Sequence, residues 1–270
     1  MENSPQNLPD MDTLARLAKY ERELRALQMG QQSWLQAISH DLRAPLRHLL
    51  SFGPLVSELL EQPTPSTQDL AEARGFLLTM DQSAKRLAAM LDALLRLSRL
   101  AITPLQTRSV DLLELLENAK AAVLARPQWA GLSSTKPPRW SWPAQGATLL
   151  ADAQLLQQTL EELLDNAIKF SQHREQPHIE ISVESESDGD IALSIRDNGA
   201  GFEPARADAL FGIFQRMHRE AEFPGLGTGL AMVQSVMRRH GGQASISAHP
   251  DQGCNVRLYW PAPAFICNEA

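Results

Sequence analysis

The chain has 270 residues, of which 43% are apolar, and its 25 basic and 32 acidic residues give a formal net charge of −7. This length predicts about two domains, and an acidic chain without a basic run argues against nucleic acid as a partner. No apolar run reaches the roughly 18 residues of a membrane span, no signal-peptide pattern is present, and the two cysteines have neither a zinc nor a disulfide spacing, so we expect a protein of the reducing cytoplasm.

Two long helices are predicted in the first hundred residues. Apolar residues recur every three or four positions over 14–59 and again over 70–94, and a segment rich in Pro, Thr and Ser at 62–68 separates the two runs. The first run is weakest at Gln28 and Gln31, which indicates an adjustable coil there. The two runs predict an antiparallel hairpin. Additional apolar positions widen the stripe on each helix, so we expect two hairpins to pair into a dimeric four-helix bundle.

The pattern changes after a linker at 101–104. The sequence then predicts helices at 110–125, 152–170 and 227–240, strands at 178–184, 191–196, 244–248 and 255–260, a short strand after the loop at 136–142, and an irregular stretch with one short helix at 197–225. Strands and helices interleaved around one sheet indicate an α/β sandwich, so the expected fold class is α+β. The expected divisions are a tail and coiled coil at 1–30, a helical domain at 31–102 and the sandwich at 103–264.

The segment Ser-His-Asp-Leu-Arg-Ala-Pro-Leu at 39–46 places an ionisable ring on the first helix. His40 lies on the opposite side of this helix from the apolar seam, so it should face solvent. An ordinary surface histidine is the simplest interpretation of this residue alone. Its neighbours favour chemistry, because Asp41 can orient the ring and accept a proton, and Arg43 adds a fixed positive charge that suits phosphate.

This segment resembles the phospho-acceptor box of sensor histidine kinases. In that family the helical hairpin dimerises, and the histidine receives the phosphoryl group of ATP. The resemblance implies that His40 is the phospho-acceptor and that Asp41 assists as acid and base, beside Arg43. One helical turn after the histidine, many members have Thr or Asn, which positions the water that dephosphorylates the partner regulator. Ala44 has no hydrogen-bonding side chain, so we expect weak or absent phosphatase activity.

The predicted helix at 152–170 carries polar residues that suit a nucleotide. Glu162 and Asn166 are four residues apart and share a face, and the amide oxygen of Asn166 suits Mg²⁺ that carries nucleotide phosphates. Lys169 is placed to meet a phosphate oxygen, and Phe170 is placed to flank an aromatic base. A solvated helix face with Phe170 in the core is an equally good interpretation of this segment taken alone.

Two glycine-rich segments follow. Asp197 precedes a turn that Gly199 and Gly201 allow, so its carboxylate can accept a hydrogen bond from the amino group of a base. A simple strand-ending turn has the same pattern. The segment Gly-Leu-Gly-Thr-Gly at 225–229 precedes a helix and offers backbone N–H groups and the positive end of that helix to phosphates. The sequence around it fits neither a Rossmann nor a Walker A arrangement.

These three segments, with Phe211 and Phe214 between the second and the third, resemble in order the N, G1, F and G2 boxes of the histidine-kinase ATP-binding domain. That domain belongs to the GHKL group of gyrase, Hsp90, histidine kinase and MutL, and the segment after Phe214 is similar to phytochrome-like kinases. The resemblance implies that Asn166 holds Mg²⁺, that Asp197 recognises the adenine amino group, and that residues 203–224 form a mobile lid. The implied ATP-binding residues are Asn166, Lys169, Phe170, Asp197, Gly199, Gly201, Phe211, Phe214, Gly225, Gly227, Thr228, Gly229 and Leu230.

Glu162 departs from the family, which usually has asparagine at this place. Glutamate there resembles the ATP-hydrolysing GHKL proteins, in which it activates water. A role in the outer coordination shell of Mg²⁺ is the other interpretation, and the sequence leaves both open.

The sequence as a whole predicts a homodimeric protein-histidine kinase that uses ATP and Mg²⁺, phosphorylates itself on His40, and passes the phosphoryl group to an aspartate of a response regulator. Input reaches the N-terminal coil from a sensor partner, or the chain is a fragment of a longer kinase. One alternative is a GHKL-type ATPase or anti-sigma-like serine kinase without phosphohistidine, against which the intact His40 box argues. Another is a non-catalytic dimeric adaptor, against which the intact nucleotide motifs argue. The choice between phosphorylation within a protomer and across the dimer stays open.

Overall fold

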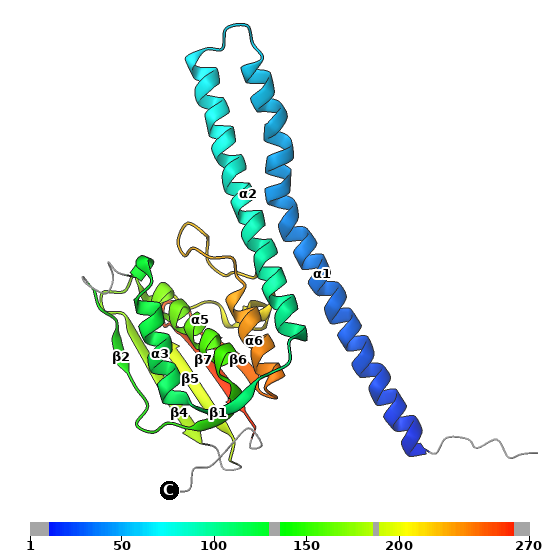
Figure 1. Ribbon diagram of the computed structural model, residues 1–270, viewed down its shortest axis with the longest axis vertical. Helices are drawn as coiled ribbons and strands as arrows, with labels where there is room; N and C mark the ends of the chain where they lie inside the picture. Colours follow the sequence, from blue (N-terminus) through cyan, green and yellow to red (C-terminus); the bar gives the residue numbers. More distant parts are fainter. Residues whose placement is uncertain (1–10, 130–135, 186–188, 262–270) are drawn as a thin grey trace, which may run out of the picture. The chain divides into compact units, whose positions relative to one another are not determined.

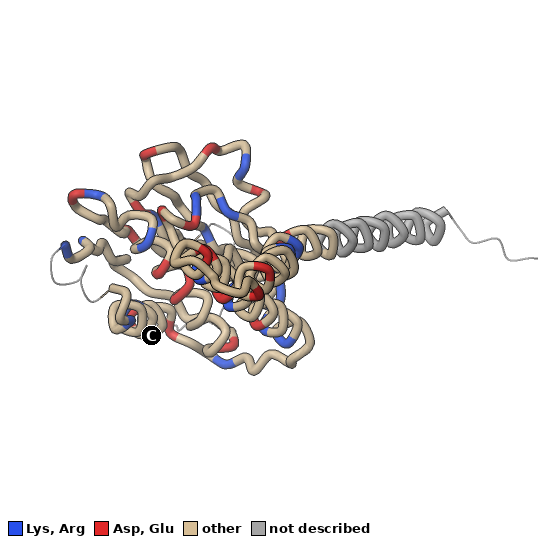
Figure 2. The backbone as a smooth tube through the Cα atoms, turned by 90° about the horizontal axis from the view of Figure 1, so that it is seen from above, with Lys and Arg blue, Asp and Glu red and all other residues tan. Residues whose placement is uncertain are grey.

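The computed structural model describes the backbone of residues 11–129, 136–185 and 189–261, and the side chains of these ranges from residue 35 onward. The chain divides into two compact units, Met1–Ala84 and Lys85–Ala270, shown in Figure 1. Basic and acidic residues are interspersed along the described backbone (Figure 2). No helix within the described ranges is both long and apolar enough to cross a membrane.

The first unit is built from α1 (Met11–Leu60) and the beginning of α2 (Thr67–Ile102). The connection between them, residues 61–66, overlaps the segment rich in Pro, Thr and Ser that the sequence predicts as the break at 62–68. α1 stays helical through Pro45 and Pro54. Within this unit the C-terminal half of α1 and the N-terminal half of α2 lie side by side and antiparallel (Figure 1), which confirms the predicted hairpin.

Aromatic stacking and a helix cap hold the hairpin. The rings of Phe52 on α1 and Phe76 on α2 are stacked with centroids 5.0 Å apart, and the ring of His48 lies 5.7 Å from that of Phe52. At the start of α2, Ser66 N and Oγ donate to Asp69 Oδ2 at 2.8 and 2.7 Å, and Asp69 N donates to Ser66 Oγ at 3.1 Å. This reciprocal capping satisfies backbone donors of the first turn, and it fixes where α2 begins.

The heptad repeat on the hairpin is only partly covered. Val56 and Ala73 are buried, whereas Leu70 and Leu77, which belong to the same predicted repeat, are each 49% exposed. One neighbouring helix can cover only one side of a helix whose apolar stripe is this wide, as the sequence predicts for a lone hairpin. The large apolar side chains left exposed on α1 and α2 are Leu35, Leu46, Leu50, Leu55, Leu60, Leu70, Leu77, Leu78, Leu91, Leu95 and Ile102.

The second unit is an α/β sandwich in which helices cover one face of a five-stranded sheet (Figure 1). The strands lie in the order β2 (Arg139–Ser141), β4 (His178–Ser185), β5 (Ile191–Asp197), β7 (Cys254–Trp260) and β6 (Gln243–Ala248). β2 is parallel to β4, and the other neighbours are antiparallel. The helices are α3 (Leu112–Leu124), α5 (Ala153–Ser171) and α6 (Gly229–Arg239). The 3₁₀ helices are η1 (Pro127–Trp129), η2 (Pro204–Arg206) and η3 (Asp208–Phe211).

The structure corrects the predicted elements at several places. A second, two-stranded sheet pairs β1 (Thr107–Asp111) with β3 (Thr148–Asp152). β1 is not predicted, β3 lies where a short strand is predicted after the loop at 136–142, and β2 lies within that predicted loop. The helix predicted from residue 110 begins at Leu112, because Asp111 Oδ1 accepts two backbone N–H groups of the next turn at 2.8 and 3.2 Å and is the N-cap. The single short helix predicted within 197–225 is wrong, since η2 and η3 both lie there.

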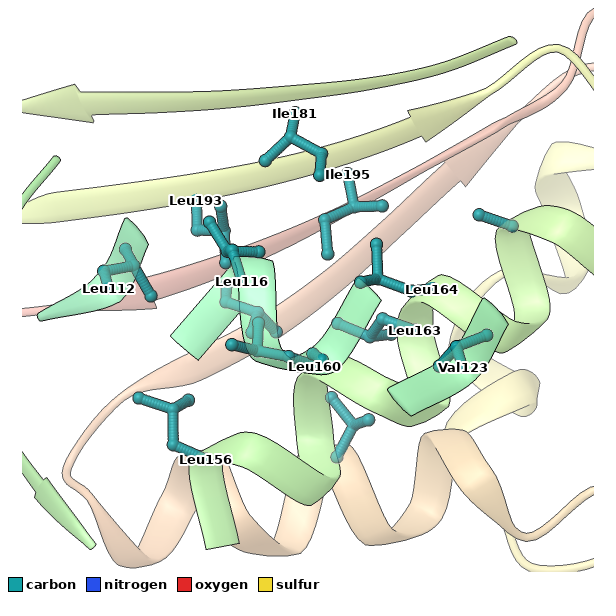
Figure 3. Close-up of a cluster of buried hydrophobic side chains, with 14 of the residues drawn as sticks. Leu112, Leu116, Val123, Leu156, Leu160, Leu163, Leu164, Ile181, Leu193 and Ile195 are labelled. Atoms are coloured by element: carbon teal, nitrogen blue, oxygen red, sulfur yellow. The ribbon is translucent and has the colours of Figure 1, made fainter. Parts of the chain in front are cut away.

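The core of the sandwich lies between the helices and the sheet (Figure 3). Leu116 of α3, Leu160 of α5 and Leu193 of β5 are fully buried. Asp152 Oδ1 accepts the backbone N–H groups of the first turn of α5 at 3.1 and 3.2 Å, so Asp152 is the N-cap of this helix. Because one side of α5 packs in this core, its polar residues, Asn166 among them, are fixed on the other side.

Candidate functional site

His40 is exposed on α1 beside a carboxylate. Its side chain is 81% exposed, and its Nδ1 lies 3.0 Å from Asp41 Oδ1. A neutral imidazole donates from one nitrogen and accepts at the other. The carboxylate therefore favours the proton on Nδ1 and leaves the lone pair of Nε2 for a nucleophilic role. Arg43 and Ala44 are exposed on the following turn.

The second unit contains a cavity of about 580 Å³, lined by α5, by the segment 201–230 and by the facing residues of β6 and β7. The predicted nucleotide-binding residues that line it are Glu162, Asn166, Lys169, Phe170, Gly201, Gly225, Gly227, Thr228, Gly229 and Leu230. Asp197, the last residue of β5, and Gly199, in the turn after it, are not among the residues that line the cavity. Phe211 and Phe214 are buried in the segment predicted as a lid and do not line the cavity.

The polar face of α5 and the glycine loop meet at one end of the cavity. A Cβ at Gly229, the first residue of α6, would lie 2.6 Å from Glu162 Oε2, so glycine lets the helix start approach this carboxylate. Lys169 Nζ donates to Asn166 Oδ1 at 2.7 Å. Burial raises the pKa of Glu162 and lowers the pKa of Lys169. A helix N-terminus and an ammonium group converge here, which suits nucleotide phosphates, and the amide oxygen beside them suits a cation.

Asp197 ends β5 and is 7% exposed. Its Oδ1 accepts the backbone N–H of Gly199 at 2.7 Å. Burial raises the pKa of Asp197 to about 6, and the backbone N–H groups of Gly199 and Cys254 oppose this rise. The guanidinium groups of Arg174 and Arg196 oppose it as well. At neutral pH the carboxylate is therefore mainly ionised, and an ionised carboxylate accepts hydrogen bonds and donates none.

An aromatic cluster forms another wall of the cavity. Phe170 at the end of α5 packs against His218 and Phe223, with ring centroids 5.6 and 5.1 Å away, and the last two rings are 5.0 Å apart. His218 Nε2 lies 2.9 Å from the carbonyl oxygen of Gly201. Such a wall suits the flat face of a base. Of these three residues, the sequence analysis assigns only Phe170 to the site. His218 and Phe223 lie within the predicted lid at 203–224, and their aromatic rings are the feature that could have identified them.

A third wall comes from η1, which the sequence does not associate with the site. Gln128 and Trp129 line the cavity. Asp165 of α5 holds them there, because its Oδ1 accepts from Trp129 Nε1 at 2.9 Å and from Gln128 Nε2 at 3.2 Å. Arg126 Nη1 donates to the same oxygen at 2.9 Å. No local pattern in the sequence links η1 to α5.

The oxygen donors at the phosphate end suit a magnesium ion that arrives with a nucleotide. Mg²⁺ prefers hard oxygen ligands and is commonly held by one or two protein oxygens together with substrate phosphates. Asn166 Oδ1 and the Glu162 carboxylate are such donors. Among the residues that the structure describes, no group of three or more His, Cys, Asp or Glu side chains could hold a metal. The residues present therefore fit a nucleotide-borne ion better than a cage made of protein alone.

The part of the chain that forms this cavity matches a known family. Residues 151–264 match the model of the histidine kinase-, DNA gyrase B-, and HSP90-like ATPases. The chain is 28% identical over 256 residues to cyanobacterial phytochrome A of Nostoc sp. strain PCC 7120. The matched region covers 95% of this chain and 31% of the relative. It is 28% identical over 248 residues to the sensor protein KdpD of Escherichia coli K12, with 92% and 25% covered. The chain is therefore similar to sensor histidine kinases over most of its length.

The sequence similarity to these relatives extends over both units, and a solved structure shares the fold. The structure of full-length ShkA in complex with AMPPNP superposes with a TM-score of 0.53 at 21% identity, covering 85% of this chain and 45% of that one. The relatives include phytochromes and KdpD alike, so they do not single out the phytochrome-like subgroup. The chain spans about a quarter to a third of the length of the curated relatives that it matches first.

Proposed function

We propose that the chain is an ATP-dependent protein-histidine kinase that phosphorylates itself on His40 and passes the phosphoryl group to an aspartate of a response regulator. One observation carries this proposal. A homologue of sensor histidine kinases has, in one chain, an exposed histidine whose Nδ1 meets the Asp41 carboxylate and a cavity of nucleotide size lined by the N-box and glycine-loop residues.

The proposed reaction has two transfers. In the first, Nε2 of His40 attacks the γ-phosphorus of ATP, the bond from that phosphorus to the bridging oxygen breaks, and ADP leaves with the electron pair. Asp41 takes the Nδ1 proton as the ring gains positive charge. In the second, a carboxylate oxygen of the regulator attacks the same phosphorus, the P–N bond breaks, and Asp41 returns the proton. His40 is then neutral again.

The cavity would contribute position and charge to this reaction, because phosphoryl transfer needs little else. Lys169 and the N-terminus of α6 would bind phosphate oxygens, and Asp197 would accept the adenine amino group. Asn166, with Glu162 nearby, would hold Mg²⁺, which neutralises charge on the phosphates when bound. Thr228 and Leu230 line the cavity beside them.

The proposed domains follow from these roles. Residues 31–102 would form the dimerisation and phospho-acceptor domain and residues 103–264 the catalytic domain. The exposed leucines of α1 and α2 would pack against a second hairpin, since a four-helix bundle covers both sides of each helix. Residues 1–30 would carry input from a sensor, although residues 1–10 and the side chains before residue 35 lie outside the described part. We place the reaction in the cytoplasm, where ATP and response regulators meet.

Transfer of label from γ-labelled ATP tests the proposal. The full chain is incubated with this ATP and Mg²⁺ as wild type, as His40→Gln, and as His48→Gln, which changes another histidine of the same helix. We expect label that is lost in acid and kept in base on wild type and on His48→Gln, and none on His40→Gln. Label that persists on His40→Gln would refute the assignment, and acid-stable label would indicate a serine kinase instead.

A GHKL-type ATPase without phosphohistidine is the second candidate, and Glu162 is the observation that favours it. Its carboxylate lies at the phosphate end, where the family usually has asparagine, and a positioned carboxylate can activate water. Burial raises its pKa, which makes the ionised form a stronger base. Phosphate release that continues in His40→Gln and stops in Glu162→Gln would support hydrolysis. Phosphate release that stops in His40→Gln would exclude this second candidate and support the kinase.

A further inference from the structure

Arg174 joins two turns that lie far apart in the sequence. It follows the end of α5, and its Nε donates to the carbonyl oxygen of Asn198 at 2.8 Å. Its Nη2 donates to the carbonyl oxygens of Gly199 at 2.7 Å and Asp251 at 2.8 Å, and it approaches Asp251 Oδ1 at 3.4 Å. One guanidinium group therefore holds the turn after β5 and the turn between β6 and β7 at the same time.

These two turns enclose Asp197. On one side, the backbone N–H of Gly199 donates to Asp197 Oδ1 at 2.7 Å. On the other side, the backbone N–H of Asp251 donates to the carbonyl of Ala200 at 2.7 Å. A Cβ at Gly253 would lie 1.9 Å from the carbonyl oxygen of Asp197, so the second turn reaches the backbone of the aspartate itself. Movement of either turn would displace this carboxylate.

The charge of Arg174 acts on the same carboxylate. Burial favours the neutral form of Asp197, and Arg174 favours the ionised form. Arg196 of β5 acts in the same sense, and the thiol of Cys254 faces the carboxylate from β7. On β4 the residue opposite is the apolar Ile179. Of the two cations, Arg174 is the one whose donors also bind both turns.

We propose that Arg174 is a positioning residue for nucleotide selection, which holds the turns around Asp197 closed and so aims its carboxylate at the amino group of adenine. This inference rests on the proposed role of Asp197 in adenine recognition. Arginine suits the task because its planar fork serves several carbonyl oxygens at once, whereas lysine supplies the same charge at a single point.

Base specificity should depend on this arginine. Adenine presents an exocyclic amino group where guanine presents a carbonyl oxygen. An ionised carboxylate accepts a hydrogen bond from the amino group of adenine and repels the carbonyl oxygen of guanine. A protonated carboxyl group can donate a hydrogen bond to that carbonyl oxygen. Without Arg174, Asp197 should take up a proton at higher pH. The preference for adenine over guanine should then shrink.

Binding of ADP and GDP by the full chain, measured by calorimetry with Mg²⁺ over a pH series from about 5 to 8, tests this. Wild type should prefer ADP and lose ADP affinity as pH falls through about 6, the pKa of Asp197. In Arg174→Gln the midpoint of this loss should move to higher pH, and a rise of about one pH unit should reduce the ADP preference up to about tenfold at pH values below the new midpoint. Arg174→Lys should keep the wild-type midpoint, because the charge remains, but bind ADP more weakly. The matched control is Arg139→Gln, an exposed arginine of β2, which should behave as wild type.

The variants separate the possible outcomes. Because histidines also change charge in this pH range, the difference between variants is measured and not the wild-type midpoint alone. An Arg174→Gln protein with the wild-type midpoint and wild-type ADP preference would overturn the inference and leave Arg174 a structural tie. Failure of wild type to bind ADP would instead refute the proposed function. If Arg174→Gln does not fold, as thermal unfolding would show, Arg174→Lys decides alone, and wild-type ADP affinity in that variant would overturn the inference.

Discussion

The hairpin and the sandwich differ in how completely each buries its apolar side chains. On α1 and α2, Leu50 is 68% exposed and Leu77 is 49% exposed, whereas Leu116 and Leu160 of the sandwich core are fully buried. Burial of one leucine contributes about 1.5–3 kcal/mol to the free energy of unfolding. The exposed leucines of the hairpin do not contribute this free energy in a single chain. The sandwich buries its core within one chain, and we expect the hairpin to pack against a partner surface.

The two units differ in the same way in their chemistry. His40 has 81% of its side chain exposed, whereas Asp197 is 7% exposed. Exposure would keep His40, the proposed phospho-acceptor, available to two different partners, the nucleotide and the regulator. Burial sets the charge and aim of the nucleotide-binding groups before any ligand arrives. Substitutions in the hairpin should therefore alter assembly and transfer, and substitutions in the sandwich should alter affinity and pH dependence.

The largest expected effect is the loss of the dimer. The triple substitution Leu70→Glu, Leu77→Glu and Leu91→Glu places charges on the exposed stripe of α2, and it should convert the wild-type dimer to a monomer without changing ADP affinity. Sedimentation velocity measures the first property and calorimetry the second. Leu150→Glu is the matched control, because Leu150 is 41% exposed on β3 of the sandwich. A monomeric wild type, or a triple variant that stays dimeric, would break the comparison.

The substitution Asp41→Asn should slow phosphorylation of His40 by about 100-fold, within the usual range for a positioned acid–base group. The Asp41 carboxylate oxygen lies 3.0 Å from His40 Nδ1, and an amide in its place cannot take the Nδ1 proton. Initial rates with labelled ATP measure the effect, and ADP affinity should stay unchanged. A rate close to that of wild type would show that Asp41 only accompanies the histidine.

The substitution Asp197→Asn should lower ADP affinity by about 10–100-fold, the cost of a lost hydrogen bond to a charged group. Its effect on stability has the opposite sign. The folded pKa of Asp197, about 6, exceeds the unfolded value, so the stability that this group contributes is present at low pH and is lost as pH rises through about 6. Above that pH the variant should therefore be more stable than wild type, by roughly 1–3 kcal/mol.

Urea unfolding of Asp197→Asn and wild type at two pH values checks this sign. The advantage of the variant should vanish near pH 4, where wild-type Asp197 is protonated in the folded chain. A variant that is less stable than wild type at both pH values would contradict the account of the buried carboxylate.

The smallest expected effect concerns Ala44. The substitution Ala44→Thr supplies a hydroxyl one turn after His40, and it should raise the rate at which the chain dephosphorylates its regulator severalfold from a low value. The measurement is the loss of label from a response regulator that this chain has phosphorylated, with Ala44→Val as a control of similar shape. Equal rates in all three proteins would show that position 44 does not govern this reaction.

The parts of the fold that could be predicted are those with a long, regular pattern. α1, α2 and α5 have periodic apolar residues and clear breaks or caps at their ends. β1 could not be predicted, because Val110 is the one apolar residue of Thr107–Asp111, and the strand exists through its pairing with Thr148–Asp152. In the proposed nucleotide site, residues that lie close together in the sequence, such as those of the glycine loop at 225–229, could be assigned to the site from the sequence. Trp129 and Arg174 could not, since they reach the site by tertiary packing and their own segments carry no signal.

Mapping the phosphoryl group in the full chain tests the central claim most directly. The chain is treated with ATP and Mg²⁺, digested at alkaline pH to preserve a P–N bond, and examined by tandem mass spectrometry. The proposed function predicts one phosphoryl group, located on His40. An unmodified His40 peptide, with the phosphoryl group on another residue or with ATP consumed and no residue modified, would contradict it.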